Sequence, residues 1–348
     1  MLDFDIGTMS SREKIIKSAL PVVIYGMGNG ADKVIDEFEK LHIPVLGVTA
    51  SDDFVRGQNF RGFTVKKLSE FEGDFILCPA FGSSIPSVME HLFSLNEKYR
   101  LIYPVVPVFG NEIFDRDFLV ANEDKINAAY NLFGEKSKRI YEKCLRFIYG
   151  GDLDDLRDAT SEKDEIFENF LCLNEKDSFL DLGAYRGDTI EEFLKYTGGK
   201  YGEIIGVEPD EKTYNKMLEK LKVLQSFTPV CAAVSDKDGV VNFSSFAGRQ
   251  SAISHIGKEK KSVTIDALCE SKNITYIKMD VEGAELAAIC GGEKTIREKK
   301  PKLNIALYHR TSDIFEIPLA VHKLNPNYEF EIRKHPYIPC WDMNLYCR

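Results

Sequence analysis

Residues 179–189 constrain the fold of this chain more than any other stretch. Residues 178–182 are mostly apolar, with Asp181 near their end, and are typical of a buried strand. Gly183 and Gly187 allow a tight backbone turn that can lie close to a ligand. The polar residues that follow suit the first turn of a helix. A strand, a glycine turn and a helix N-terminus predict a nucleotide-type pocket at the carboxyl end of a parallel sheet.

A second glycine turn lies in residues 26–31, directly after a predicted strand at 21–25. Its glycines fit the G-x-G-x-x-A dinucleotide fingerprint, and Asp52 or Asp53 lies where a ribose-binding acid would sit. A bound nucleotide or sugar nucleotide is one interpretation. A plain scaffold turn is the other, and we favour it because glycines also permit close packing.

Strands and helices alternate through two parts of the chain, which predicts α/β architecture with two Rossmann-like parallel-sheet units. We expect the first unit over residues 1–110 and a helical connector over residues 111–176, where apolar residues recur at helical spacing. The second unit covers residues 177–348 and ends in an antiparallel hairpin at 328–333 and 344–348. A fourth strand of the first unit is expected at 101–108.

Composition excludes several classes of partner. The formal net charge of −10 argues against a nucleic-acid binder, which needs a basic face. No run approaches the roughly 20 apolar residues of a membrane span, and the acidic N-terminus has no signal-peptide core, so we expect no membrane partner and a cytoplasmic location. The eight cysteines form no CxxC pair and the six histidines show no ligand spacing, so we predict buried thiols and no metal.

The charged residues around the two glycine turns predict different ligands for them. Asp181 and Asp188 flank the turn at 183–187, and these carboxylates would repel a pyrophosphate. A cationic or zwitterionic ligand suits them better. S-adenosylmethionine carries a sulfonium, an ammonium and a ribose diol, and Glu208 at the end of the next predicted strand could accept hydrogen bonds from that diol.

Residues from about 177 to the C-terminus resemble the FkbM family of S-adenosylmethionine-dependent methyltransferases. The resemblance implies a class I methyltransferase fold, a seven-stranded sheet whose last strand is antiparallel. It covers about half the chain, and the last of its main motifs is the most specific. These motifs are residues 179–188 (FLDLGAYRGD), 206–209 (GVEP), 232–236 (AAVSD) and 277–286 (IKMDVEGAEL).

The resemblance also implies roles for individual residues. The methionine portion of the cofactor would be held at the end of the first strand, and the ribose by Glu208. The backbone after the third strand would flank the adenine, with Asp236 at the same edge. Asp280 would lie beside the transferred methyl group. The predicted cofactor-binding residues are therefore Asp181, Gly183, Tyr185, Gly187, Asp188, Glu208, Cys231, Ala232 and Asp236.

Methyl transfer is a displacement in which the acceptor loses a proton and lies about 3 Å from the methyl group. Asp280, Glu282 and His309 are the candidate bases, since each follows the carboxyl end of a predicted strand. His309 has the most suitable ordinary pKa, with a structural histidine as the alternative. Lys278 alternates with Asp280 and could orient it, or form a buried ion pair. Glu285 lies in the first turn of a predicted helix, where stabilisation by the helix dipole alone explains a glutamate.

We therefore expect a methyltransferase that uses S-adenosylmethionine to methylate a hydroxyl oxygen of a small molecule, a sugar or secondary metabolite. The first unit, which accompanies the methyltransferase-like unit, favours a saccharide or nucleotide-linked sugar as acceptor. A homo-oligomer is left open. Two alternatives are an NAD-dependent oxidoreductase that uses the turn at 26–30 and a non-catalytic adenosyl-binding module. The polar loop of Arg249, Gln250 and Ser251, before His255, is a candidate acceptor contact, with a solvated loop as the alternative.

Overall fold

The chain divides into two compact units in a computed structural model that describes residues 2–245, 251–253 and 258–348. Neither unit is one continuous stretch of sequence. The first comprises Met1–Asn127, Glu135–Ser161 and Lys334–Asp342. The second comprises Ala128–Gly134, Glu162–Arg333 and Met343–Arg348. The domain boundaries expected at 110 and 176 stay a prediction.

The first unit contains a parallel sheet of three strands in the order β2-β1-β5. Its apolar residues surround the fully buried strand β1 and the inner face of α2. The fourth strand predicted at 101–108 is absent from the described residues, because only Leu101 pairs with Leu77, as an isolated bridge. The elements are α1 (Ser11–Ser18), β1 (Val22–Tyr25), α2 (Asn29–Lys40), β2 (Val45–Thr49), η1 (Asp52–Phe54), β3 (Asn59–Phe60), β4 (Phe63–Thr64), η2 (Leu68–Glu70), β5 (Ile76–Pro79), α3 (Pro86–Asn96), α4 (Arg116–Tyr130, of which the residues after Asn127 belong to the second unit), α5 (Glu135–Gly150) and α6 (Leu153–Ala159).

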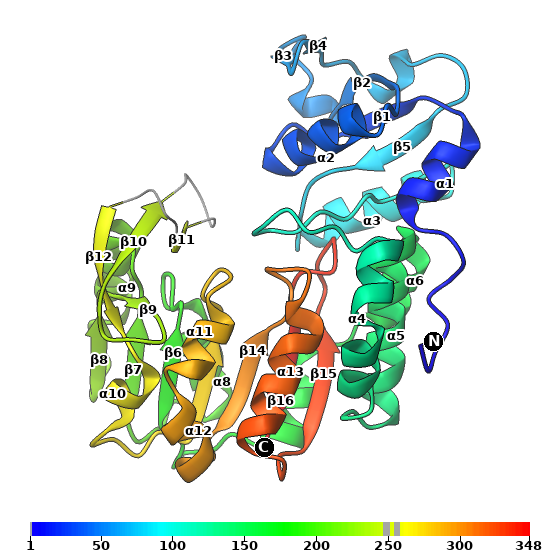
Figure 1. Cartoon of the computed structure of the whole chain (residues 1–348). Coiled ribbons are helices and arrows are strands. Elements are labelled where there is room, and N and C mark those ends of the chain that lie inside the picture. The colour runs from blue at the N-terminus through cyan, green and yellow to red at the C-terminus, as the bar shows by residue number, and fades with distance from the viewer. Residues whose placement is uncertain (1, 246–250, 254–257) are drawn as a thin grey trace. The chain divides into compact units, whose positions relative to one another are not determined.

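The second unit is built on a seven-stranded sheet in the order β15-β16-β14-β13-β6-β7-β8 (Figure 1). The pairs β14–β13, β13–β6, β6–β7 and β7–β8 are parallel, and β16 is antiparallel to β14. This topology confirms the predicted sheet and its closing hairpin. The strands are β6 (Phe179–Leu182), β7 (Ile204–Val207), β8 (Phe227–Val230), β13 (Tyr276–Met279), β14 (Lys302–Ala306), β15 (Phe330–Lys334) and β16 (Met343–Cys347).

Helices cover both faces of this sheet (Figure 1). One core packs Phe179 and Tyr276 against Phe193 of α8, with ring centroids 4.8 Å and 6.2 Å from that of Phe193. Phe179 and Asp181 on β6, like Tyr276 and Lys278 on β13, are two residues apart, so the aromatic rings lie on the same face of the sheet as the charged groups near the strand ends. The helical elements are α7 (Lys163–Ile166), the π-helical turn η3 (Phe167–Leu171), α8 (Asp188–Tyr196), α9 (Glu211–Leu221), α10 (Ile265–Cys269), α11 (Glu285–Cys290), α12 (Glu293–Lys299) and α13 (Asp313–Leu324).

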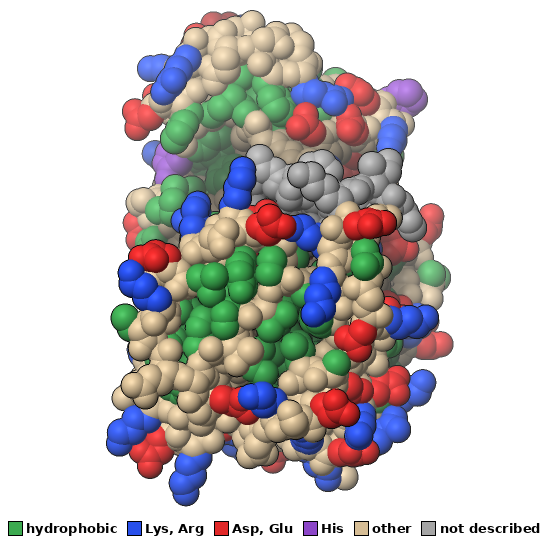
Figure 2. Space-filling model, turned by 90° about the vertical axis from the view of Figure 1, so that its left-hand side faces the viewer, with side chains coloured by type: hydrophobic (Ala, Val, Ile, Leu, Met, Phe, Trp, Pro, Cys, Tyr) green, Lys and Arg blue, Asp and Glu red, His purple; other side chains and the backbone are tan. Residues whose placement is uncertain are grey.

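Strand β8 forms one edge of the seven-stranded sheet, and Pro229 lies within it. Proline has no backbone N–H to donate, so it is compatible with an edge and discourages pairing with another chain. On this side of the molecule, hydrophobic side chains gather with charged ones around them (Figure 2).

A small four-stranded sheet, β11-β10-β12-β9, lies in the connection between β8 and β13. The sequence predicts a strand at 240–243, within β10, and a third strand at 227–234 that includes the residues of β9. The charge run at 258–261 hid the strand character of β12. Its strands are β9 (Ala233–Val234), β10 (Gly239–Ser245), β11 (Ser251–Ile253) and β12 (Lys258–Val263). Among the described residues, no helix combines the length and apolar character needed to cross a membrane.

The turn after β6 approaches the end of β13 closely at Gly183. This glycine has a φ of +81°, and a Cβ built on it would lie 1.8 Å from the backbone oxygen of Asp280. Any side chain at this position would push the two strand ends apart. Gly183 therefore sets the spacing of the turns at which the predicted site residues lie.

We predict that Gly183→Ala destabilises the protein by more than about 3 kcal/mol, because the new methyl group overlaps backbone and occupies a left-handed conformation. Gly198→Ala is the matched control, since Gly198 has a φ of +62° with nothing within 4 Å of its Cβ position. It should lose only about 1–2 kcal/mol. Denaturant unfolding measures both values, and equal losses would contradict the steric explanation.

Candidate active site

Four adjacent strands of the second unit end in polar residues at the same edge of the sheet. Asp181 lies at the end of β6, Glu208 follows β7, Asp280 follows β13, and His309 lies shortly after β14. Because β7, β6, β13 and β14 are consecutive and parallel, their carboxyl ends lie side by side. This edge is the usual ligand site of an open α/β sheet.

Lys278 lies between two carboxylates. It pairs in register with Asp181 on the neighbouring strand, and its Nζ atom is 3.9 Å from Asp181 Oδ1 and 3.4 Å from Asp280 Oδ2. Burial lowers the pKa of Lys278, but Asp280 and Asp181 more than offset this, so the net pKa is raised and the side chain stays charged. The predicted buried ion pair is thus present, and it has two acids.

Asp181 is fully buried, and burial raises its pKa despite the nearby lysine. One carboxylate oxygen accepts a hydrogen bond from the Thr189 hydroxyl at the start of α8. The other, Oδ1, has no hydrogen-bond donor among the described residues. A buried acceptor without a donor is unfavourable, so this atom suits a ligand that donates, such as an ammonium group.

Asp280 faces the opening of the site, with 31 % of its side chain exposed. The Tyr308 hydroxyl lies 3.2 Å and 3.3 Å from its two carboxylate oxygens. Desolvation acts to raise the pKa of Asp280, but Lys278, His309 and Tyr308 together lower it below its ordinary value. Asp280 is therefore a carboxylate at neutral pH and a weak proton acceptor.

His309 is 1 % exposed and meets three carboxylates. Its Nδ1 is 2.8 Å from Glu285 Oε1, and its Nε2 is 3.4 Å from both Asp280 Oδ1 and Glu282 Oε2. Burial opposes the charged ring, but Glu285 and the other two acids raise the pKa of His309 to about 10. Burial also raises the pKa of Glu282, to about 8, with 26 % of its side chain exposed.

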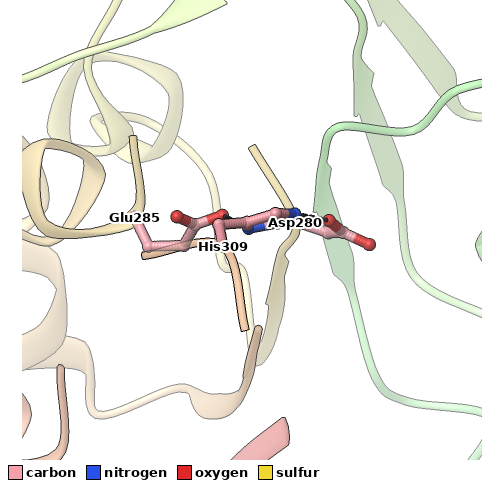
Figure 3. A group of neighbouring side chains, drawn as sticks. All are labelled: Asp280, Glu285 and His309. Atoms are coloured by element: carbon pink, nitrogen blue, oxygen red, sulfur yellow. Dashed lines mark hydrogen bonds and ion pairs between the residues drawn. The ribbon is translucent and has the colours of Figure 1, made fainter. Parts of the chain in front are cut away.

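Asp280, Glu285 and His309 are also the one set of described side chains that could hold a metal ion, with ligand atoms within 4.8 Å of one another. The imidazole ring lies between the two carboxylates, which approach opposite nitrogens (Figure 3). The two carboxylates do not converge on one point. The three side chains therefore form a line of charged groups, with the imidazole ring in the middle. The expectation of no metal stays a prediction.

Glu208 follows the end of β7, and Tyr185 lies in the turn after the neighbouring strand β6. Glu208 accepts hydrogen bonds from the backbone N–H groups of Tyr185, at 3.0 Å, and Asp210, at 2.8 Å. Tyr185 has a φ of +48°, a conformation that non-glycine residues rarely adopt. Burial raises the pKa of Glu208 to about 7. Each of its oxygens keeps a lone pair, so ionised Glu208 can accept from a ribose diol.

The remaining predicted cofactor-binding residues are less closely connected to the cluster of strand-end residues described above. Gly187 precedes α8 with a φ of +82° and packs against Leu221. Asp188 points to Lys220 of α9, at 2.6 Å, and is exposed, so its contact is an ion pair on the surface. Half-buried Cys231 and buried Ala232 follow β8, next to β7, and exposed Asp236 accepts from Ser235 at 3.1 Å. Of the candidate acceptor contacts, Arg249 and Gln250 lie outside the described residues, and Ser251 begins β11.

Three further residues of the site were missed or explained differently from the sequence. Tyr308 was passed over beside the histidine that follows it. Glu285 was assigned to the helix dipole alone, although its side chain is buried and bonded to His309. Asp313, at the start of α13, is 1 % exposed, and burial and Glu285 raise its pKa to about 7. The strand-end position of Tyr308 was a usable signal, whereas the other two depend on packing between distant segments.

The glycine turn of the first unit is explained by packing. A Cβ on Gly30 would lie 2.6 Å from the backbone oxygen of Ala80, and one on Gly26 would lie 3.3 Å from the same atom. These glycines let the start of α2 pack against the end of β5. Asp52 and Asp53 are exposed in η1. The scaffold interpretation accounts for both glycines, and nucleotide binding at this turn stays a prediction.

Comparisons with known proteins agree with this geometry. Residues 181–334 match a family model described as the methyltransferase FkbM domain. None of the curated proteins compared with the chain matches it. A crystal structure of the methyltransferase FkbM from Methylobacillus flagellatus KT is similar over 97 % of this chain and 92 % of that chain, with a TM-score of 0.71 and 19 % identity.

Two further solved structures are similar over about half of this chain. Fibrillarin from Aeropyrum pernix, in complex with natively bound S-adenosyl-L-methionine, has a TM-score of 0.34 at 14 % identity over 51 % of this chain and 68 % of that chain. Precorrin-6y C5,15-methyltransferase from Geobacter metallireducens GS-15 has a TM-score of 0.34 at 12 % identity over 54 % and 92 %. At these TM-scores, neither adds to the fold assignment.

We predict that Lys278→Met lowers the free energy of unfolding by about 3 kcal/mol at pH 7, because it leaves two carboxylates without their buried cation. Lys195→Met, which breaks an exposed pair with Asp164, is the control and should leave stability nearly unchanged. The loss for Lys278→Met should shrink as the pH falls and be smallest below the lowered pKa of Asp280, because there both acids are protonated with or without the lysine. A loss that does not depend on pH would contradict this explanation.

Proposed function

From the premise that residues 181–334 match the methyltransferase FkbM domain, we propose that the protein uses S-adenosylmethionine to methylate a hydroxyl oxygen of a small-molecule acceptor. The observation that carries this proposal is the Glu282 carboxylate. It is partly exposed beside Asp280 at the end of β13, and desolvation raises its pKa to about 8. A carboxyl group with that proton affinity can take a proton from a hydroxyl near neutral pH.

The residues fit the cofactor by charge. Asp181, Asp280 and Glu285 outnumber the two buried cations of the cluster, Lys278 and His309, so the site favours a ligand with positive charge. The ammonium group would meet the oxygen of Asp181 that has no hydrogen-bond donor among the described residues, and the ribose would meet Glu208.

Glu282 is a better general base than His309 in this arrangement. Three acids hold His309 in its protonated form, so its ring has no lone pair to accept a further proton. Asp280 is held ionised by Lys278 and Tyr308 and is too weakly basic. We assign Glu282 to proton removal and Asp280 to orientation of the acceptor hydroxyl.

Bound S-adenosylmethionine supplies an electrophilic methyl group: the acceptor oxygen forms the new bond to carbon, the carbon–sulfur bond breaks, and its electron pair leaves on the neutral sulfur of S-adenosylhomocysteine. The hydroxyl proton goes to Glu282, which releases it to solvent through its exposed edge. Lys278 and His309 keep the surrounding carboxylates charged and in place while Glu282 gains the proton.

A sugar or a nucleotide-linked sugar is the acceptor class that we propose. Support comes from the FkbM resemblance and from the separate α/β unit that accompanies the methyltransferase domain. We propose the cytoplasm as the location. The described residues form no disulfide, in accord with a reducing compartment, although Cys172 and Cys290 are exposed and are not the buried thiols expected.

We predict that the full-length protein releases S-adenosylhomocysteine when it is mixed with S-adenosylmethionine and members of a panel of free and nucleotide-linked sugars. Glu282→Gln should lower turnover on the same acceptor by about 10²–10⁴-fold, because it removes the proton acceptor. Cofactor affinity should change by less than about threefold.

Glu298→Gln, an exposed glutamate of α12, is the matched control and should retain full turnover. If Glu282→Gln also retains turnover, the assigned base is wrong. If no sugar of the panel supports product formation or raises the melting temperature of the whole protein, the acceptor class is wrong.

A further inference from the structure

One oxygen of Glu285 bonds to two parts of the site at once. Glu285 Oε1 is 2.8 Å from His309 Nδ1 and accepts the backbone N–H of Val281 at 2.9 Å. The side chain is completely buried. An exposed first-turn glutamate would account for the helix dipole equally well, so burial of this charge calls for another explanation.

The Val281 N–H group belongs to the turn that carries both candidate catalytic carboxylates. Asp280 precedes Val281 and Glu282 follows it. Glu282 has a φ of +54°, which is unfavourable for a residue with a side chain, so surrounding contacts must hold the turn. The bond from Val281 to Glu285 is such a contact, and it lies between the two carboxylates.

His309 connects the same glutamate to the carboxylates themselves. Figure 3 shows its ring between Glu285 and Asp280. With Nδ1 bonded to Glu285, Nε2 faces Asp280 Oδ1 and Glu282 Oε2, at 3.4 Å from each. The ring therefore transmits the position and the charge of Glu285 to the open side of the site.

We infer that Glu285 is the positioning residue of this site: it holds His309 as an imidazolium and fixes the turn at Val281, so that Asp280 and Glu282 are presented together to the acceptor. This inference rests on the proposed function for what the two carboxylates do. It does not depend on the acceptor's identity. Without the negative charge of Glu285, the buried imidazolium would lose its nearest partner.

The other charged or titratable groups around His309 come from three elements. Lys278, Asp280 and Glu282 belong to β13 and the turn after it, and Tyr308 and Arg310 flank His309 after β14. Asp313 comes from α13, where it accepts the Arg310 backbone N–H at 2.8 Å. Glu285 is the acid closest to the ring, and its effect on the pKa of His309 outweighs those of Asp280 and Glu282. Removing Glu285 should therefore change the ring's protonation most.

The test is nuclear magnetic resonance of the histidine rings in the full-length protein, with His309→Gln used to assign the His309 signal. We expect a doubly protonated ring at pH 7.5 in the wild type. In Glu285→Gln, an amide oxygen can still accept from Val281, but the charge is gone. The proton affinity of His309 should then fall at least tenfold, and the ring should lose its proton at a correspondingly lower pH.

Glu293→Gln is the matched control, because Glu293 is an exposed acid in the first turn of the next helix, α12. It should leave the His309 signal unchanged. Glu285→Asp retains the charge on a shorter side chain, so His309 should stay protonated. On an acceptor found as above, turnover by Glu285→Gln and Glu285→Asp should fall at least tenfold, with S-adenosylmethionine affinity within about threefold of wild type.

A neutral His309 ring in the wild type at pH 7.5 would overturn the inference. So would a Glu285→Gln protein with the wild-type His309 signal, or a copurified metal ion whose removal shifts that signal. If Glu285→Gln does not fold, Glu285→Asp decides: wild-type turnover in that variant would contradict the positioning role. Because the ring signal needs no acceptor, failure of this inference can be told apart from failure of the proposed methyl transfer.

Discussion

Lys278 is the charge on which the arrangement of the second unit's site depends. It lies between Asp181 and Asp280, on adjacent strands whose ends could not otherwise carry two carboxylates in a buried setting. The close approach of Gly183 to Asp280 brings the strand ends together. Packing and electrostatics are therefore coupled: the glycine permits the short distance, and the lysine makes that distance electrostatically acceptable.

Beyond this pair, the site uses buried groups to control more exposed ones. His309 and Glu285 are almost completely buried, whereas Asp280 and Glu282 keep about a quarter to a third of their side chains exposed. The buried pair sets the charge and the position of the two more exposed carboxylates, and these carboxylates face the ligand. This division explains why Glu282, in a strained conformation next to two other acids, can have a proton affinity suited to neutral pH.

Local motifs could be predicted from the sequence because their signals are local. The strand, turn and helix at 179–196 are encoded by consecutive residues, and the run at 276–285 places Lys278 and Asp280 on one face of a strand. The partners across strands could not be predicted. That Lys278 is in register with Asp181, or that Glu285 reaches His309, depends on the pairing of β13 with β6 and β14.

The error at 101–108 also has a physical cause. The segment is apolar enough for a strand, but only Leu101 has a pairing partner in the described sheet. The role of His309 as a base stays a prediction. Its ordinary pKa favoured that role, and the three acidic neighbours that argue for Glu282 instead could not be counted from the sequence.

The two glycine turns differ in their surroundings. Glycines of both turns make room for protein backbone, at Ala80 for Gly26 and Gly30 and at Asp280 for Gly183, but only the turn after β6 lies among the carboxylates that call for a cationic ligand. Calorimetric titration of the full-length protein at pH 8 with S-adenosylmethionine, and separately with NAD(H), tests this distinction most directly. We predict that S-adenosylmethionine binds and that Glu208→Gln weakens it at least about tenfold, through loss of charged hydrogen bonds. Binding of NAD(H) alone, or unchanged binding of S-adenosylmethionine by Glu208→Gln, would contradict the account.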